Sequence, residues 1–211
     1  GGRGGSVRIA VGSGTSGTGG HLSFGSGRST VATGGLICML SGEGTATSSG
    51  AIIVKTANAG VAGSTGRLIF SSGSSKDGNS GAIIIGSGAA TGGRGGDINF
   101  EVGSGTSGSG GAIALTAGRS THSSGGRVVI CSGEGTQRSS GAIFFVSANA
   151  GVSGSSGRLV FSSGSANGGN SGAILIGSGT ATGGSGGLVS ISAGSGTSGI
   201  GGAGYISGGA S

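Results

Sequence analysis

Residues 97–111 read DINFEVGSGTSGSGG, and two close variants of this stretch begin at Ser6 and at Leu188. The three copies start 91 residues apart, since 97 − 6 and 188 − 97 both equal 91. The sequence between the copies repeats in the same order. The chain 1–211 is therefore one repeat array, with blocks at 6–96 and 97–187 and a partial third block at 188–211. Such a period predicts a stack of similar units, because one unit alone cannot bury its apolar residues.

The composition excludes an ordinary globular core. The 211 residues include 60 glycines, no proline, no tryptophan and only 3% aromatic residues. A flexible glycine- and serine-rich linker is the first alternative, but aliphatic pairs such as Val7 and Ile9 return at fixed spacing. Collagen is the second alternative, and the glycines do not fall on every third position. The pattern therefore favours an ordered repeat protein.

Each complete 91-residue block divides into six units of 15 or 16 residues. Positions 2 and 4 of a unit are apolar nearly throughout, and this period-two alternation is typical of a β-strand with one buried face. Glycine at position 7 and a GG or SG pair at the end of the unit predict two corners per unit. The units begin at Ser6, His21, Leu36, Ala51, Arg67, Ala82, Asp97, Ala112, Arg127, Ala142, Arg158, Ala173, Leu188 and Ala203.

The fold predicted from this pattern is all-β: a parallel β-solenoid of about 15 residues per lap, without helices. Positions 1–6 form one strand, a glycine corner follows at position 7, and a shorter strand of small residues occupies positions 9–13. Laps stacked about 4.8 Å apart bury the apolar positions as continuous ladders. An alternative lap of about 30 residues follows from alanine at position 1 of every second unit, although it requires unusually long corners.

The charge pattern limits the classes of partner. A net charge of +6 is compatible with a polyanionic polysaccharide. The basic residues are spread singly, almost without aromatic residues between them, which argues against a nucleic-acid partner. No apolar run approaches 18 residues, so no membrane span is expected. Both ends of the sequence interrupt a repeat, and we expect a longer array in the natural protein.

The sequence offers no catalytic or cofactor site. His21 and His122 occupy different columns of the repeat and the five acidic residues are scattered singly, so no triad or carboxylate pair assembles. The GSGTSG motif at Gly12 lacks the following helix that a nucleotide phosphate requires. Asp97 follows GGRGG but does not recur in each lap, which excludes a calcium ladder. We therefore expect no enzyme activity, no cofactor and no bound metal.

The whole array resembles glycine-, serine- and threonine-rich parallel β-solenoid repeat proteins of algal and other protist cell surfaces, including filament-forming mastigoneme components. Units such as SGEGTATSSGAI and SGEGTQRSSGAI carry this resemblance. It implies an architectural role outside the cell or at its surface and transfers no functional residues. We expect a structural filament or wall protein that associates with itself end to end and laterally, because neither end supplies a cap for its strand.

Threonine recurs on the second predicted strand and gives an alternative function. Regular threonines on a flat solenoid face resemble the ice-binding surface of β-solenoid antifreeze proteins. Charged residues interrupt this face at Arg28, Glu43, Arg119 and Glu134, which favours a purely structural role for the threonines. The threonines of this ladder are Thr15, Thr30, Thr45, Thr106, Thr121, Thr136, Thr180 and Thr197.

Position 3 of the first predicted strand gives a candidate lateral interface. This position points outward if positions 2 and 4 point inward, yet it is apolar over much of each block. Contiguous exposed apolar patches usually mark interfaces; a strand covered on both faces within one chain is the alternative. The interface residues are Ile53, Ile69, Ile84, Val129, Phe144, Val160 and Leu175.

The two cysteines, Cys38 and Cys131, lie six units apart in different columns of the repeat. In a solenoid of 15-residue laps that separation is about 29 Å along the axis, whereas a disulfide needs Cα atoms within about 7 Å. An intermolecular disulfide between copies shifted by one block is one interpretation. Two free thiols packed as small apolar groups are the other.

Overall fold

A bend or turn recurs once in every complete unit of the repeat. The computed structural model describes residues 4–209, and within that range no residue belongs to a helix or a strand. The bends begin at position 10 of a 15-residue unit, and the two 16-residue units have a tighter two-residue turn instead. Bends or turns occupy 15–17, 30–32, 45–47, 61–62, 76–78, 91–93, 106–108, 121–123, 136–138, 152–153, 167–169, 182–184 and 197–199.

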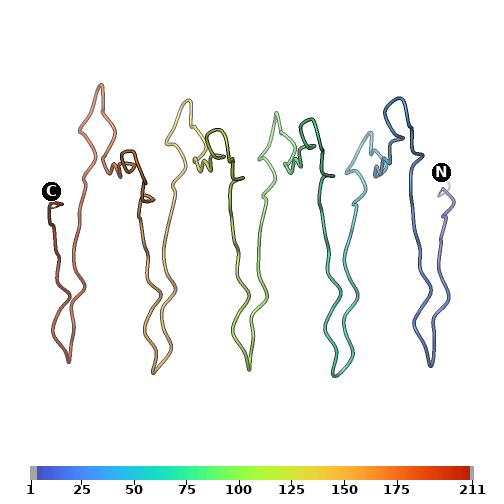
Figure 1. Cartoon of the computed structure of the whole chain (residues 1–211), viewed down its shortest axis with the longest axis horizontal. Coiled ribbons are helices and arrows are strands. Elements are labelled where there is room, and N and C mark those ends of the chain that lie inside the picture. The colour runs from blue at the N-terminus through green and yellow to red at the C-terminus, as the bar shows by residue number, and fades with distance from the viewer. Residues whose placement is uncertain (1–3, 210–211) are drawn as a thin grey trace. The chain divides into compact units, whose positions relative to one another are not determined.

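Each bend forms the end of a protruding loop, here called an arm, that runs from position 7 to the last residue of the unit (Figure 1). In six arms a backbone hydrogen bond joins the two ends, with the last glycine donating to the carbonyl oxygen of position 7 at 2.8–3.1 Å. The bonded pairs are Gly20 with Gly12, Gly35 with Gly27, Gly50 with Gly42, Gly126 with Gly118, Gly141 with Gly133, and Gly202 with Gly194.

Small residues allow the two sides of an arm to approach at its base. A Cβ atom on Gly35 would lie 3.1 Å from Cβ of Ser26, and one on Gly187 would lie 3.1 Å from Cβ of Ser178. Serine, threonine, alanine or valine therefore precedes each arm at position 6, and glycine closes it at the last position. This packing accounts for two columns of the repeat.

Position 9 controls the bend itself. In three arms it is a serine whose hydroxyl oxygen accepts a hydrogen bond from the backbone N–H three residues later, as Ser29 does from Ala32 at 2.9 Å. Ser75 and Ser120 do the same for Gly78 and Ser123. The corresponding residue in arm 164–172 is Ala166, which has no such acceptor. That arm instead contains Gly168 with φ of +97°, a backbone conformation suited to glycine.

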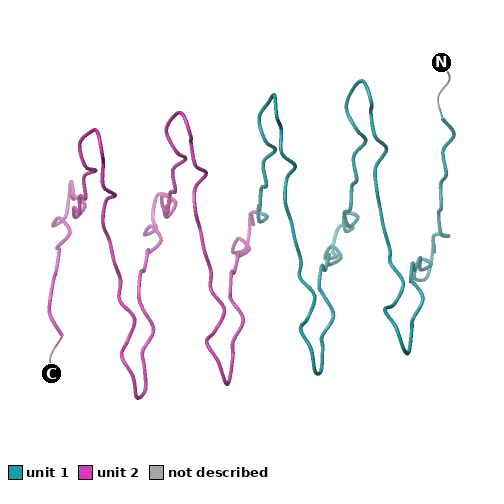
Figure 2. Cartoon of the chain, turned by 90° about the horizontal axis from the view of Figure 1, so that it is seen from above, with its two compact units in different colours: residues 1–103 teal, residues 104–211 magenta. Residues whose placement is uncertain are grey.

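By its internal contacts the chain divides into two larger parts, Gly1–Gly103 and Ser104–Ser211, which are coloured separately in Figure 2. We call these parts contact units, to distinguish them from the 15- or 16-residue units of the repeat. Within each contact unit the arms repeat their direction every third arm (Figures 1 and 2). We number the arms of one such turn first, second and third. The first arms point to the lower side of Figure 1, and the second and third arms point to opposite sides of Figure 2. One turn spans 45 or 46 residues, the spacing between Ser6, Ala51 and Asp97.

The predicted β-solenoid is wrong for this chain. A β-ladder requires backbone hydrogen bonds between neighbouring segments, and all backbone bonds among residues 4–209 join residues within one repeat unit. Neither a 15-residue nor a 30-residue lap is formed, because three arms complete a turn. The expected corner at position 7 is also wrong, since the chain reverses at positions 10–12. Period-two alternation specifies which side chains share a face, but it does not specify a pairing partner.

The described residues form no buried core. No residue among them is buried, and the six that are half-buried all lie in arms or at their bases: Ser29, Gly44, Ser72, Ala117, Gly135 and Ser163. The polar arms are thus the most enclosed parts of the molecule. The apolar residues, which normally drive folding, remain in contact with solvent.

Candidate interaction surface

The extended segments between the arms, positions 1–6 of each unit, carry the apolar surface. Every large apolar side chain among residues 4–209 is at least 44% exposed. Exposure still alternates along a segment: Ile52 and Val54 are 52% and 53% exposed, whereas Ile53 between them is 77% exposed. The predicted alternation of sides is therefore present, although neither side is covered.

Successive segments in the first contact unit enclose open apolar hollows. One hollow of about 430 Å³ is lined by Phe70 together with Ile83, Ile84 and Ile85. Another of about 230 Å³ is lined by Phe24 together with Ile37, Cys38 and Met39. In both cases a phenylalanine at position 4 before a second arm faces positions 2–4 of the next segment. The same unit positions therefore produce the same feature 46 residues apart.

An aromatic pair joins two successive segments in the second contact unit. The ring centroids of Phe145 and Phe161 lie 6.3 Å apart with an interplanar angle of 82°. This edge-to-face geometry is favourable and contributes roughly 0.5–1.5 kcal/mol beyond area burial. The two rings occupy position 4 of their units, which shows that this position points toward the neighbouring segment.

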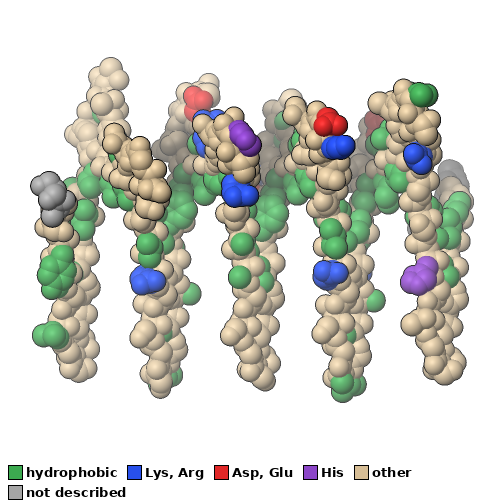
Figure 3. All heavy atoms as spheres, in the orientation of Figure 1, with side chains coloured by type: hydrophobic (Ala, Val, Ile, Leu, Met, Phe, Trp, Pro, Cys, Tyr) green, Lys and Arg blue, Asp and Glu red, His purple; other side chains and the backbone are tan. Residues whose placement is uncertain are grey.

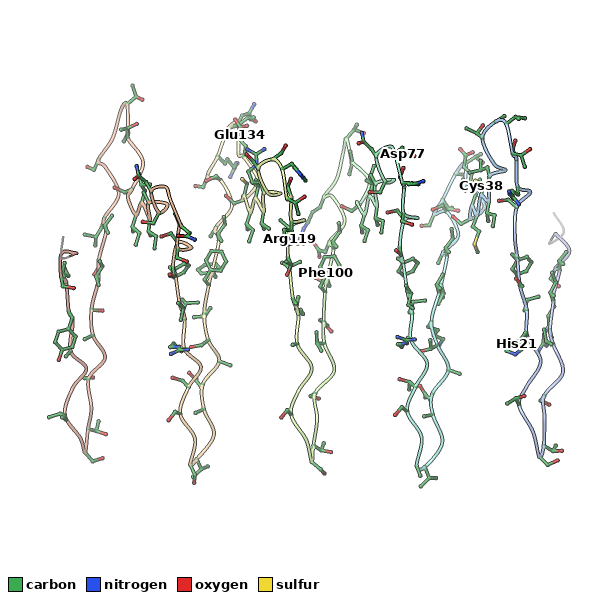
Figure 4. The ribbon with its side chains drawn as sticks, viewed as in Figure 1. His21, Cys38, Asp77, Phe100, Arg119 and Glu134 are labelled. Atoms are coloured by element: carbon green, nitrogen blue, oxygen red, sulfur yellow. The ribbon has the colours of Figure 1, made fainter. Side chains whose placement is uncertain are left out.

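The structure leaves the predicted lateral residues at position 3 in solvent. All seven are exposed, from 61% for Val160 to 90% for Ile84. Their association with another chain stays a prediction. The cysteines are likewise exposed and unbonded; Cys38 lines a hollow, and Figure 4 shows it on a segment next to an arm.

The threonines of the candidate ice-binding ladder lie at the tips of arms, where Thr15, Thr30 and Thr45 each begin a bend. Successive arms point in different directions (Figure 1), so neighbouring threonines do not form one flat row. Thr180 lies two residues before the bend at 182–184 and is out of register with the others. Ice binding therefore gains no geometric support from this arrangement.

Charged residues distinguish the arms, a feature that the sequence pattern had indicated only as interruptions of the threonine face. No first arm contains an Asp, Glu, Lys or Arg residue. The second arms 27–35 and 118–126 carry Arg28 and Arg119 at position 8, and the following third arms carry Glu43 and Glu134 there. In Figure 3 the visible acidic side chains lie on the side opposite the tips of the first arms, whereas some basic side chains lie lower, toward those tips.

The described residues form no cluster of metal-binding side chains. No group of three or more His, Cys, Asp or Glu side chains among residues 4–209 is close enough to hold a metal ion. The one ion pair within this range joins Arg94 and Asp97 at 3.8 Å, with both side chains largely exposed. Over the same residues no helix has the length and apolarity that crossing a bilayer requires.

Comparison with known proteins returns no relative of this chain. No protein-family model, no curated protein and no solved structure matches it. The function must therefore be inferred from the repeat and its exposed surface.

Proposed function

We propose that this chain is a structural, non-enzymatic protein that acts at a cell surface or outside the cell by assembling with copies of itself. One observation carries the proposal: the large apolar side chains recur at fixed positions of the units, and each of them among residues 4–209 is at least 44% exposed. Exposed apolar surface of this extent indicates an interface. The resemblance in composition to repeat proteins of cell-surface filaments supports the location.

The exposed area indicates how extensive the assembly must be. The chain exposes 20793 Å², whereas a folded monomer of 19.0 kDa exposes about 8,400 Å². The excess is several times the roughly 1,600 Å² buried by a standard protein–protein interface. A single dimer contact would leave most of it in water. Contacts with neighbours on more than one side, as in a filament or a sheet, account for it better.

Self-association also suits a repeat that lacks a conventional core. One unit contributes two or three apolar side chains, and their burial is worth about 25 cal/mol for each Å² removed from water. A neighbouring copy presents the same positions at the same spacing, so each contact made once is repeated along the array. Lateral contact through position 3 and end-to-end contact through the terminal units are both part of this proposal.

Sedimentation of the purified chain over a range of concentrations tests the proposal. We expect large species above a critical concentration, together with a rise in β-signal by circular dichroism as segments of different copies pair. A chain that stays a monomer without regular structure up to millimolar concentration contradicts it. Thermal hysteresis of freezing by that monomer would instead support the ice-binding alternative.

A further inference from the structure

The arms that carry arginine or glutamate at position 8 are also the most regularly closed. Among the eight second and third arms, a hydrogen bond between the two end glycines occurs in four: 27–35, 42–50, 118–126 and 133–141. These are the arms of Arg28, Glu43, Arg119 and Glu134. The other four, 73–81, 88–96, 164–172 and 179–187, have no such bond. Among the second and third arms, closure therefore accompanies a charge at position 8, and the pattern repeats 91 residues later.

Within these closed arms the tips are further constrained. Ser29 and Ser120 each accept a hydrogen bond across the bend next to an arginine. In the arms with glutamate, position 9 is glycine because the chain folds back closely: a Cβ on Gly135 would lie 2.6 Å from the carbonyl oxygen of Arg138. The charged side chains therefore project from well-defined loops rather than from loose ones.

Among residues 4–209 the position-8 charges form no ion pair. The ion pair between Arg94 and Asp97 involves neither these arginines nor these glutamates, and it is the one formed by residues 4–209. In the arms of the intervening turn a charge of opposite sign lies close by, since Lys76 is followed by Asp77 and Arg94 is paired with Asp97, whereas Lys55 and Arg67 lie outside the arms. Arginine and glutamate on successive arms are kept apart because second and third arms point to opposite sides (Figure 2).

We propose that the arginine arm of one copy docks on the glutamate arm of a second copy, Arg28 or Arg119 facing Glu43 or Glu134. This inference rests on the proposed self-assembly and adds the surfaces that set its register. Each contact unit has an arginine arm on one side and a glutamate arm on the opposite side, so the contact is heterologous. A copy that uses its arginine arm keeps its glutamate arm free, and the assembly grows without closing on itself.

The ion pairs select the register more than they supply the affinity. An exposed ion pair contributes little to affinity, whereas charge complementarity orients partners and rejects wrong alignments. The apolar segments next to the arms supply the burial. Arg138 also lies on the arm of Glu134 and reduces its net charge, so we assign the larger part of the complementarity to the Glu43 arm.

Charge reversal with mixing tests this proposal. The variant R28E/R119E has glutamate on both kinds of arm, and the variant E43R/E134R has arginine on both. Each variant alone should need at least tenfold more protein to assemble than the unmodified chain, because like charges then meet. An equimolar mixture should assemble near the unmodified concentration, since the two variants can alternate. The quadruple variant R28E/E43R/R119E/E134R should also assemble.

A matched control variant and the choice of measurement distinguish failure of arm docking from failure of self-assembly. The variant R67E/R158E makes the same two substitutions 91 residues apart, at position 1 outside the arms, and should assemble normally at equal salt. Sedimentation gives the critical concentration, and two fluorescent labels report co-assembly of the mixture. If both reversed variants assemble like the unmodified chain, or if mixing fails to restore assembly, the docking of arms is wrong while self-assembly stands. If the unmodified chain does not assemble, both proposals fail.

Discussion

At the scale of single residues, the arms are specified by glycine and serine at fixed positions. Glycine is required at position 9 of the GSGTSG and GEGT arms because the chain folds back onto it. Within one arm, a Cβ on Gly105 would lie 2.6 Å from the carbonyl oxygen of Gly108, whereas a Cβ on Gly103 or on Gly108 itself meets nothing within 4 Å. For most of the 60 glycines, a Cβ atom would therefore meet no close neighbour. At position 9 of these arms it would clash with the backbone.

The arm 133–141 offers a direct test of that distinction. In the variant G135A the new methyl group clashes with the carbonyl oxygen of Arg138, 2.6 Å away. The bend must open, which should weaken the hydrogen bond from Gly141 to Gly133, now 2.9 Å. If the clash lowers the free energy of opening the arm by about 1 kcal/mol, the Gly141 amide should exchange with solvent roughly fivefold faster. Nuclear magnetic resonance measures this exchange rate.

The control variant G133A lies in the same arm. A Cβ at Gly133 meets no atom within 4 Å, and the backbone carbonyl that accepts the hydrogen bond is kept. Exchange at Gly141 should then match the unmodified chain. Equal exchange in G135A and G133A would contradict the close approach at position 9.

At the scale of elements, the sequence predicted the unit but not its form. Bends and turns recur at the predicted spacing of 15 residues, with the longer units at Ala51 and Ala142. The sequence also predicted the side of the segment on which Ile52 lies, because successive side chains of an extended segment point to opposite sides. The direction of each arm was not, since it depends on how glycine and serine pack at the base of the arm. The charged arms were visible as Arg28 and Glu43 but had no three-dimensional context.

The open hollows lead to a prediction about which face associates. Ile37 lines a hollow at position 2 of its segment, and Val128 is its counterpart 91 residues later. The variant I37D/V128D places carboxylates on surface that assembly must bury, which is costly for an unpaired charge. We expect at least a tenfold rise in critical concentration. The variant I69D/V160D at position 3 should remove lateral bundles and leave single filaments visible by electron microscopy.

The matched control adds the same charge at position 3 of two units in which the side chain at that position is small or polar. The variant S23D/A114D should change the critical concentration by less than about twofold. If it inhibits assembly as strongly as I37D/V128D, the added charge rather than the hollow is responsible. If I69D/V160D keeps its bundles, position 3 is not the lateral contact.

At the scale of the whole molecule, the described residues bury no apolar core within one chain. Its arms satisfy local backbone groups, but its apolar positions remain exposed at 44% or more. We propose that burial between copies stabilises the chain where it exceeds the entropy lost on ordering a glycine-rich sequence. The predicted solenoid assumed that this burial occurs between laps of one chain. The observed three-arm turn leaves the same residues available to other chains.

The cysteines can report the alignment of those chains. Cys38 and Cys131 are free and exposed, and both lie on segments that precede a glutamate arm. A neighbour shifted by one 91-residue block keeps the arms in register, since Arg119 of one copy is then level with Arg28 of the next, one arm away from Glu43. The same shift brings segment 36–41 of one copy level with segment 127–132 of the other. Where these level segments also touch laterally, Cys38 and Cys131 of different copies come within disulfide range, about 7 Å between Cα atoms.

Single-cysteine variants distinguish this alignment from an unshifted one. With dissolved oxygen as the oxidant, the unmodified chain in assemblies should give a ladder of disulfide-linked multimers on non-reducing electrophoresis, and reductant should collapse it. Neither C38S nor C131S alone should form cross-links, because each lacks one partner. An equimolar mixture of the two should form dimers and nothing larger, since each copy contributes one thiol. Cross-linked dimers of C131S alone would indicate that equal Cys38 positions meet, and hence that neighbouring copies are not shifted by a block.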